Sequence, residues 1–386
     1  MSEEKTMKNT EQKIPALRFP EFSGEWEEKR LGEIANRITK KNKEYNENVL
    51  TISAQYGLIN QLKYFDNSVS GKNLEGYYLL EKGDFAYNRS YSNGYPMGAI
   101  KQLKNYEKGI VSTLYICFRF EDDIANSFAE QVFESGIINK ELYKIAQEGA
   151  RNHGLLNVSV IDFFNTPLFI PSLREQQKIA DFLSAVDKRL QLLKDKKAKL
   201  EEYKRGVMQR IFSQELRFTR ANGSAYEDWE EKKLGEVCEI TTGKLDANAM
   251  SDNGEYRFYT CAKEYYKIDN YAFDLEALLV SGNGANVGYI HYYKGKFNAY
   301  QRTYVLYNLD SKVDIIYLKT FLDKNLPIRI FKEKREGNTP YITMGTLTDM
   351  EISIPSLKEQ TQIANFLSAI DVKIEKLSEQ IEATEN

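Results

Sequence analysis

The most constraining feature of this 386-residue chain is an internal duplication. Residues Ile170–Asp187 read IPSLREQQKIADFLSAVD, and residues Ile354–Asp371, 184 positions later, read IPSLKEQTQIANFLSAID. Two copies of one long segment in a single chain predict two structural units of the same kind.

Each copy also has a matching opening segment. Trp26–Glu33 reads WEEKRLGE and Trp229–Glu236 reads WEEKKLGE, and the tripeptide Leu17-Arg18-Phe19 returns as Leu216-Arg217-Phe218. The residues between these shared ends resemble each other only faintly, unlike a solenoid, in which every repeat must stack on the next. We therefore predict a constant frame that carries two different inserts.

Composition indicates a globular protein with more than one hydrophobic core, since 42% of the residues are hydrophobic and 12% are aromatic. The first residues are polar, and no apolar run approaches the roughly 18 residues of a membrane-spanning helix. We expect a cytoplasmic protein with no membrane partner.

Catalytic and metal sites are not indicated. The three cysteines are odd in number, far apart and without metal-ligand spacing, so we expect reduced thiols and no metal: Cys117, Cys238 and Cys261. Only two histidines are present for acid/base work. An enzyme that uses carboxylates such as Asp84 or Glu264 stays open as an alternative, as does a coiled-coil scaffold that binds protein alone.

The duplication divides the chain into five predicted parts. Alternating segments such as Ile110–Phe120 and Thr303–Tyr307, with amphipathic stretches at Ser127–Glu148 and Val313–Leu326, predict α+β inserts. The parts are a flexible tail (1–16), a first domain (17–170), a central helix (171–215), a second domain (216–353) and a C-terminal helix (354–386).

Both helices carry a heptad pattern typical of coiled coils. Ser172 is the expected N-cap, and Glu175 is expected at the N3 position of a capping box. The segments have opposite charge balance, with eleven basic and six acidic residues in Leu173–Phe212 and three and six in Leu357–Asn386, so we expect the two helices to pair. A pseudo-two-fold relation between the two copies would make the pair antiparallel. The predicted pairing residues are Ile179, Leu183, Val186, Leu190, Leu193, Ile363, Leu367, Ile370, Ile374 and Leu377.

Each insert contains a polar, glycine-containing loop at a corresponding place, and further pairs recur at matching offsets before the shared helix. Asn and Gln side chains can bond adenine edges, Arg can bond guanine, and Tyr can stack or reach phosphate. Local basic segments support contact with DNA, because Lys82–Arg119 holds six basic and two acidic residues and Lys294–Glu336 ten and five. Our DNA-binding candidates are Asn88, Arg89, Tyr91, Asn93, Thr113, Asn152, Asn283, Asn286, Gln301, Arg302, Asn338 and Tyr341.

Other signatures argue against chemistry in this chain. Asn338-Thr339-Pro340-Tyr341 departs from the Asn-Pro-Pro-Tyr signature of adenine methyltransferases at Thr339, and no cofactor loop accompanies it. A phosphate-binding loop for ATP is also missing from the sequence. We expect no catalysis by this chain.

With these segments in place, nearly the whole chain resembles the specificity subunits of Type I restriction-modification systems. The repeated Pro-Ser-Leu-x-Glu-Gln helix starts carry the resemblance, supported by the segments at Trp26 and Trp229. It implies two α+β target recognition domains separated by two long antiparallel conserved helices that form an intramolecular coiled coil with pseudo-two-fold symmetry.

The resemblance also implies a division of labour. Each recognition domain would read one half of a bipartite sequence in double-stranded DNA, while the helices set the spacer and dock methylation subunits, two being expected. No cofactor is implied for this chain; S-adenosylmethionine, ATP and Mg are expected on partner subunits, with restriction subunits in the full complex.

Overall fold

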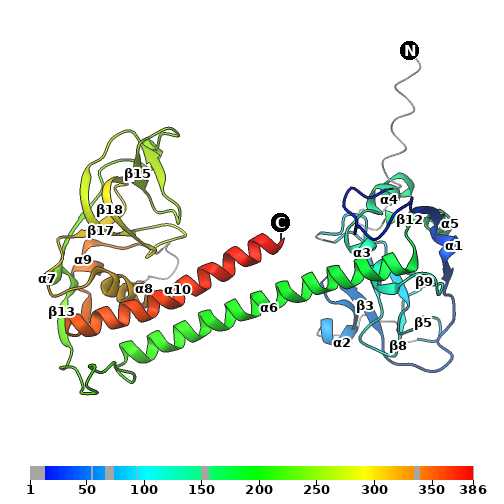
Figure 1. The fold of residues 1–386 in the computed structure, drawn as a ribbon, viewed down its shortest axis with the longest axis horizontal. Helices are drawn as coiled ribbons and strands as arrows, with labels where there is room; N and C mark the ends of the chain where they lie inside the picture. Colours follow the sequence, from blue (N-terminus) through cyan, green and yellow to red (C-terminus); the bar gives the residue numbers. More distant parts are fainter. Residues whose placement is uncertain are drawn as a thin grey trace, which may run out of the picture. The chain divides into compact units, whose positions relative to one another are not determined.

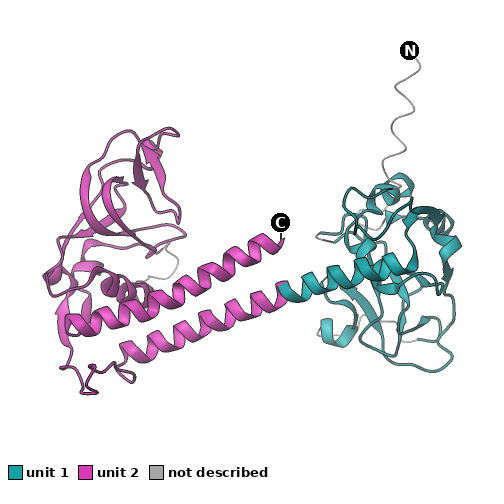
Figure 2. Ribbon diagram, viewed as in Figure 1, with its two compact units in different colours: residues 1–189 teal, residues 190–386 magenta. Residues whose placement is uncertain are grey.

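The computed structural model describes residues 14–53, 55–65, 74–92, 94–148, 156–333 and 340–385. The chain divides into two compact units, residues 1–189 and 190–386, drawn in teal and magenta in Figure 2. Both units contain helices and sheets, which confirms the α+β prediction. Helix α6 (Leu173–Phe212) belongs to both, because the first unit ends and the second begins within it.

The first unit is built on a four-stranded antiparallel sheet in the order β2-β9-β6-β7, with the smaller pairs β1-β12, β3-β4, β5-β8 and β10-β11 around it. Its strands are β1 Glu27–Arg30, β2 Ala35–Arg37, β3 Leu50–Ser53, β4 Gly57–Asn60, β5 Tyr78–Glu81, β6 Phe85–Asn88, β7 Ala99–Gln102, β8 Lys108–Val111, β9 Ile116–Phe120, β10 Gln147–Glu148, β11 Leu156–Asn157 and β12 Pro167–Ile170. Its other helices are α1 Leu31–Ile34, α2 Gln61–Tyr64, α3 Asn126–Glu134, α4 Asn139–Ile145 and α5 Val160–Phe164.

The second unit has a six-stranded sheet in the order β14-β19-β17-β18-β15-β16, plus the pair β13-β20. Its strands are β13 Glu230–Lys233, β14 Glu239–Thr242, β15 Tyr256–Tyr259, β16 Tyr266–Ile268, β17 Phe273–Ser281, β18 Ile290–Ala299, β19 Thr303–Tyr307 and β20 Glu351–Ile354. Its helices are α7 Leu234–Val237, the 3-10 helix η1 Ala247–Ala249, α8 Ile315–Glu333, α9 Met344–Thr348 and α10 Leu357–Glu385 (Figure 1).

The central strand β17 explains how this sheet is buried on both faces. Leu278 and Val280 pack on one face in the core that includes α8, while Ala277 and Leu279 pack on the other face in a second core. Successive side chains of a strand point to opposite faces, so an uninterrupted apolar run is what such a strand requires.

Two predicted segments are interrupted by turns. Ile110–Phe120 forms two strands, β8 and β9, because the chain turns between them with Tyr115 N–H donating to Ser112 O at 3.1 Å. The amphipathic stretch Ser127–Glu148 yields α3 and α4, broken at Gly136, whose φ of 70° lies in the left-handed region that favours glycine.

A buried polar latch fastens the first unit to the start of α6. The Glu175 carboxylate, 2% exposed, accepts two hydrogen bonds of 2.8 Å from the Arg18 guanidinium and one of 3.2 Å from Trp26 Nε1. The adjacent Gln176 side chain accepts from Ala125 N–H at 2.8 Å and donates to Asp123 O at 3.1 Å. The latch therefore joins the opening segment, the start of α3 and the long helix.

The second unit repeats this latch at the equivalent residues. Glu359, fully buried, accepts from Arg217 at 3.3 and 3.0 Å and from Trp229 Nε1 at 3.2 Å. Gln360 accepts from Asp314 N–H at 2.8 Å, just before α8, and donates to Lys312 O at 2.8 Å. A buried carboxylate is stable only when paired and hydrogen-bonded, so the repeated Trp, Arg, Glu and Gln form one structural motif.

The capping box predicted at Ser172 and Glu175 is formed only in part. Ser172 Oγ accepts from Glu175 N–H at 3.4 Å, as an N-cap does, but the Glu175 side chain binds Arg18 and Trp26. The Glu-Gln pair at the helix start therefore serves tertiary structure as well as the helix terminus.

The C-terminal part of α6 lies antiparallel to α10 within the second unit (Figure 1). The Lys204–Asp371 and Lys194–Glu385 ion pairs show the direction, because position rises along one helix as it falls along the other. Ile363, Leu367 and Ile370 share an apolar cluster with Val207 and other α6 side chains. Ile374 packs at the edge of this cluster, and Leu377 is 5% exposed.

The remaining predicted pairing residues lie on α6 outside that cluster. Leu190 and Leu193, in the second unit, are partly buried, as are Leu183 and Val186 in the first. Ile179 packs against the core of the first unit, which accounts for its apolar character.

Candidate nucleic-acid interface

In the second unit, three separate loops meet at the end of β17. Gly282 N–H donates to Arg302 O at 2.8 Å, and Ile342 N–H donates to Gly282 O at 2.8 Å. A Cβ atom at Gly282 would lie 2.4 Å from Arg302 O, so only glycine fits this crossing. The start of β19 and the segment before α9 are thereby held against the loop after β17.

A fourth segment, the loop that joins β15 to β16, is fastened to the same place. Asn286 Nδ2 donates to Cys261 O at 3.1 Å, and His291 Nε2 lies 3.0 Å from Ala262 O. Burial lowers the pKa of His291, so its ring is neutral near pH 7 and Nε2 carries the donated proton. Asn286 was one of our candidates, whereas Cys261, Ala262 and His291 were not, since nothing in their spacing links them to the loop after β17.

Five predicted residues come together in what we call the second loop cluster: Asn283, Asn286, Gln301, Arg302 and Tyr341. Asn283 and Tyr341 form an isolated β-bridge, and Tyr341 is 57% exposed. Gln301 Nε2 donates to Asp246 Oδ1 at 2.9 Å. Arg302 is exposed, and no hydrogen bond or ion pair within the described residues uses its guanidinium. The sixth candidate of this unit, Asn338, lies outside the described residues.

The first unit holds a corresponding group at the end of β6, which we call the first loop cluster: Asn88, Arg89, Tyr91 and Thr113. Leu156 N–H donates to Arg89 O at 2.8 Å, the bond that Ile342 makes to Gly282 in the second unit. Asn88 ends the strand, and Tyr91 is 63% exposed in the following loop. Thr113 is exposed just before β9. The candidates Asn93 and Asn152 lie outside the described residues.

The structure gives Arg89 a different task from the base contact that we expected. Its Nη1 donates to Val158 O and its Nη2 to Leu114 O, both at 2.9 Å. The Arg89 side chain thus ties the loop after β6 to the segment before β9, a connection that the Gly282 backbone makes directly in the second unit. Arg89 positions the first loop cluster.

The two basic segments found in the sequence differ in structure. In Lys82–Arg119 every lysine pairs with a carboxylate: Lys82 with Glu107, Lys101 with Glu134, Lys104 with Glu130 and Lys108 with Glu44. Arg119 binds Glu81 and Asp84. The charge count over this segment therefore does not indicate a free positive surface. It left out most of the pairing carboxylates, because these lie outside the segment.

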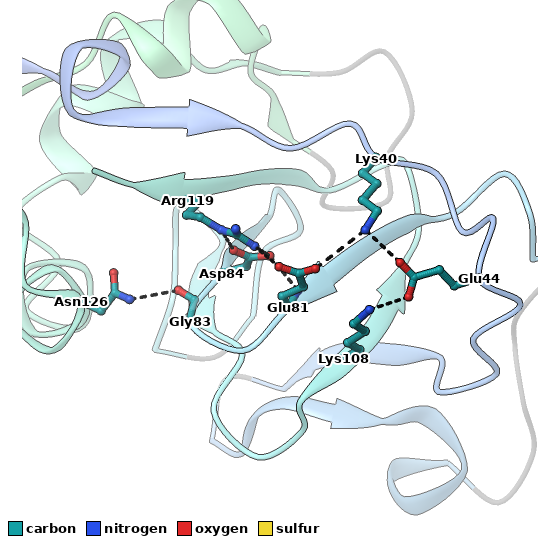
Figure 3. A network of polar contacts seen from close by, with 8 residues as sticks. All are labelled: Lys40, Glu44, Glu81, Gly83, Asp84, Lys108, Arg119 and Asn126. Atoms are coloured by element: carbon teal, nitrogen blue, oxygen red, sulfur yellow. Dashed lines mark hydrogen bonds and ion pairs between the residues drawn. The ribbon is translucent and has the colours of Figure 1, made fainter. Parts of the chain in front are cut away.

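Asp84, one of the alternative catalytic carboxylates, is part of this ion-pair network (Figure 3). It is 1% exposed, and its carboxylate accepts from Arg119 Nε at 2.6 Å and from Glu81 N–H at 2.7 Å. These contacts close the turn between β5 and β6 and explain the buried charge. Glu264 is exposed in the loop between β15 and β16.

All three cysteines are free thiols. Cys117 and Cys238 are buried free thiols, and burial raises the pKa of each to about 12. Cys261 is partly exposed, and its Sγ lies 3.5 Å from Arg302 O. Among the described residues, no three His, Cys, Asp or Glu side chains are grouped to hold a metal ion. None of the helices in the described ranges is long and apolar enough to cross a bilayer.

Two matched loop clusters on a duplicated frame agree with the comparison of this sequence with family models. The model of the Type I restriction modification DNA specificity domain matches twice, at residues 23–202 and 226–385. This chain belongs to that family. The two matches include both loop clusters and, of the latches, the Trp, Glu and Gln residues, while Arg18 and Arg217 lie just before the matched ranges. Each copy of the family domain therefore contains one candidate surface.

Individual relatives agree with this assignment. The chain is 41% identical over 155 residues to the Type I restriction enzyme EcoDI specificity subunit of Escherichia coli, a match that covers 40% of this chain and 34% of that protein. It is 26% identical over 320 residues to the MjaVIII specificity subunit of Methanocaldococcus jannaschii, covering 72% of this chain and 71% of that protein. The crystal structure of a Type I S subunit from M. genitalium shares the fold, with a TM-score of 0.59 at 15% identity and 93% of each chain covered.

Proposed function

We propose that this chain is the DNA sequence-specificity subunit of a Type I restriction-modification complex. The observation that carries the proposal is the pair of equivalent loop clusters, each joined by the same 2.8 Å backbone bond and each on its own copy of the frame. Each cluster would read one half of a bipartite target in double-stranded DNA. The exposed Gln301 and Arg302 side chains and the partly exposed Asn283 side chain are of types that can bond base edges in the major groove.

The chemistry in this proposal belongs to other subunits. This chain would supply no catalytic group, while methylation subunits bind S-adenosylmethionine and restriction subunits use ATP and Mg. The buried and ion-paired state of Asp84 supports a structural role for that carboxylate. The complex would act in the cytoplasm, where its DNA substrate lies.

The helices offer docking surface for two methylation subunits. Equivalent residues of the two copies differ in burial: Leu367 and Ile370 are 1% and 5% exposed, whereas Leu183 and Val186 are only partly buried. Phe182 is 53% exposed beside Phe19, whereas the equivalent Phe366 is partly buried against the apolar cluster that α6 and α10 share. Exposed apolar side chains of this kind favour a protein partner.

A selection experiment tests the proposed function. The purified complex of this chain with its methylation subunits would be incubated with random duplex DNA, and the retained duplexes sequenced. We expect two short specified blocks separated by a fixed gap. Two results would contradict the proposal and favour the scaffold alternative: retention of DNA without any sequence preference, or failure to retain any DNA even at low salt.

A further inference from the structure

A cleft in the second unit lies apart from the loop cluster and is lined by cations and tyrosines. Its volume is about 400 Å³, and it is formed by the β15–β16 hairpin and the neighbouring strand β18. Its lining residues are Glu255, Tyr256, Arg257, Tyr265, Lys267, Tyr293 and Lys296.

Arg257, one of the residues that line this cleft, is held in a fixed orientation. Its guanidinium carbon lies 4.3 Å from the Tyr265 ring centre and 4.4 Å from that of Tyr293. Its Nη1 also donates to Tyr259 Oη at 3.3 Å. Stacking between two rings fixes the plane of the guanidinium, and a fixed guanidinium is well suited to bind phosphate oxygens.

Two lysines extend the positive charge. Lys267 stands opposite Arg257 in the β15–β16 register, and Lys296 lies over the Tyr271 ring at 4.6 Å. No ion pair within the described residues involves these three cations. Glu255 is the one carboxylate among the lining residues, and Asp274 faces Lys296 across the β17–β18 register. The cations therefore outnumber the nearby carboxylates.

The cleft and the second loop cluster share one hairpin. The loop between β15 and β16 carries Cys261 and Ala262, which receive the contacts from Asn286 and His291, and it ends at Tyr265 in the cleft. A duplex read by the loop cluster would therefore have its sugar-phosphate backbone near this hairpin.

We propose that this cleft binds the phosphate backbone of the target duplex beside the second half-site. The inference rests on the proposed function and adds a contact that positions the DNA without reading bases. One face of each of Tyr265, Tyr293 and Tyr271 is covered by a cation. Those covered faces are unavailable for stacking with bases, which favours phosphate as the ligand over an unpaired base.

The test uses the full complex of this chain with methylation subunits and the double variant Lys267→Gln/Lys296→Gln. Affinity is measured for the target duplex and for a scrambled duplex across a range of salt concentrations. Each phosphate contact contributes about 0.9 to the slope of log affinity against log salt, so the slope should fall by roughly 1.8. Affinity should fall by a similar factor for both duplexes, and the methylated sequence should not change.

The matched control is Lys294→Gln, because Lys294 is an exposed lysine of the same strand that pairs with Glu276 at 3.4 Å and does not line the cleft. A double variant that behaves like this control would overturn the inference, as would a loss confined to the target duplex. A third result would indicate a small-anion site instead. In that case inorganic phosphate displaces DNA from the wild-type complex more strongly than chloride does at equal ionic strength, and fails to do so with the double variant. Failure of the proposed function itself would be visible separately, as wild-type protein without sequence preference.

Discussion

Arg89 and Gly282 occupy equivalent positions and make equivalent connections between loops, one with its side chain and the other with its backbone. Each carbonyl accepts a 2.8 Å bond, from the segment before α5 in the first unit and from the segment before α9 in the second. Each residue also ties the loop after its strand to the segment before a later strand, β9 or β19. Gly282 does so through its backbone N–H, and Arg89 through its side chain. A glycine makes the close backbone crossing possible, whereas a long side chain bridges a wider one.

Arg89→Ala and Arg302→Ala should therefore relax sequence discrimination in different halves of the target. Loss of Arg89 frees the Leu114 and Val158 carbonyls and loosens the first loop cluster, so discrimination in the first half-site should fall by about tenfold, the order of one lost base contact. Arg302→Ala should affect the second half-site alone. Methylation sequencing with each variant measures both, and each variant is the control for the other. Simultaneous loss of both half-sites in either variant would contradict separate roles and indicate misfolding.

At the scale of elements, the repeated latch explains why the Glu-Gln pair recurs at the start of both long helices. Glu359 and Gln360 together connect the Trp229 segment, the start of α8 and α10. Removing the charge of a buried, hydrogen-bonded carboxylate weakens several contacts at once.

Glu359→Gln should destabilise the second unit locally, by about 1.5–3 kcal/mol, because the hydrogen bonds from Arg217 and Trp229 lose their charged acceptor. Hydrogen exchange should become faster around β13 and the start of α10. Glu382→Gln, an exposed change on the same helix, should leave exchange unaltered. Equal acceleration in the first unit, where the Glu175 latch is intact, would show that the effect is not local.

The sequence predicted these elements where their cause is local. Heptad spacing gave the long helices, and Thr303–Tyr307 is a strand at the predicted bounds. Contacts between distant residues were not predictable in this way: Glu44 neutralises Lys108 from 64 positions away, and the acceptors of Arg89 lie 25 and 69 positions away. Candidate loops could thus be located, but not which side chains are engaged within the fold.

At the scale of the whole molecule, two recognition domains on one chain require a device that sets the distance between half-sites. In our account α6, continuous from Leu173 to Phe212, is that device. A helix rises 1.5 Å per residue, so a change in its length alters distance by a calculable amount.

Inserting four residues between Lys194 and Lys199 adds about one helical turn, or roughly 6 Å. We expect the gap in the methylated sequence to lengthen by about two base pairs, at 3.4 Å each, while both half-sites stay the same. Four exposed residues inserted instead at the Asn222-Gly223 turn serve as the control, with no change in the gap. An unchanged gap in the helix variant would show that α6 does not set the spacing.

The central claim is that this chain selects a bipartite DNA sequence, and methylation sequencing tests it most directly. DNA would be compared between cells that express the methylation subunit with this chain and cells that express the methylation subunit alone. We predict N6-methyladenine in a two-part sequence with a fixed gap, only when this chain is present. A stable complex that produces no new methylated sequence would contradict the claim.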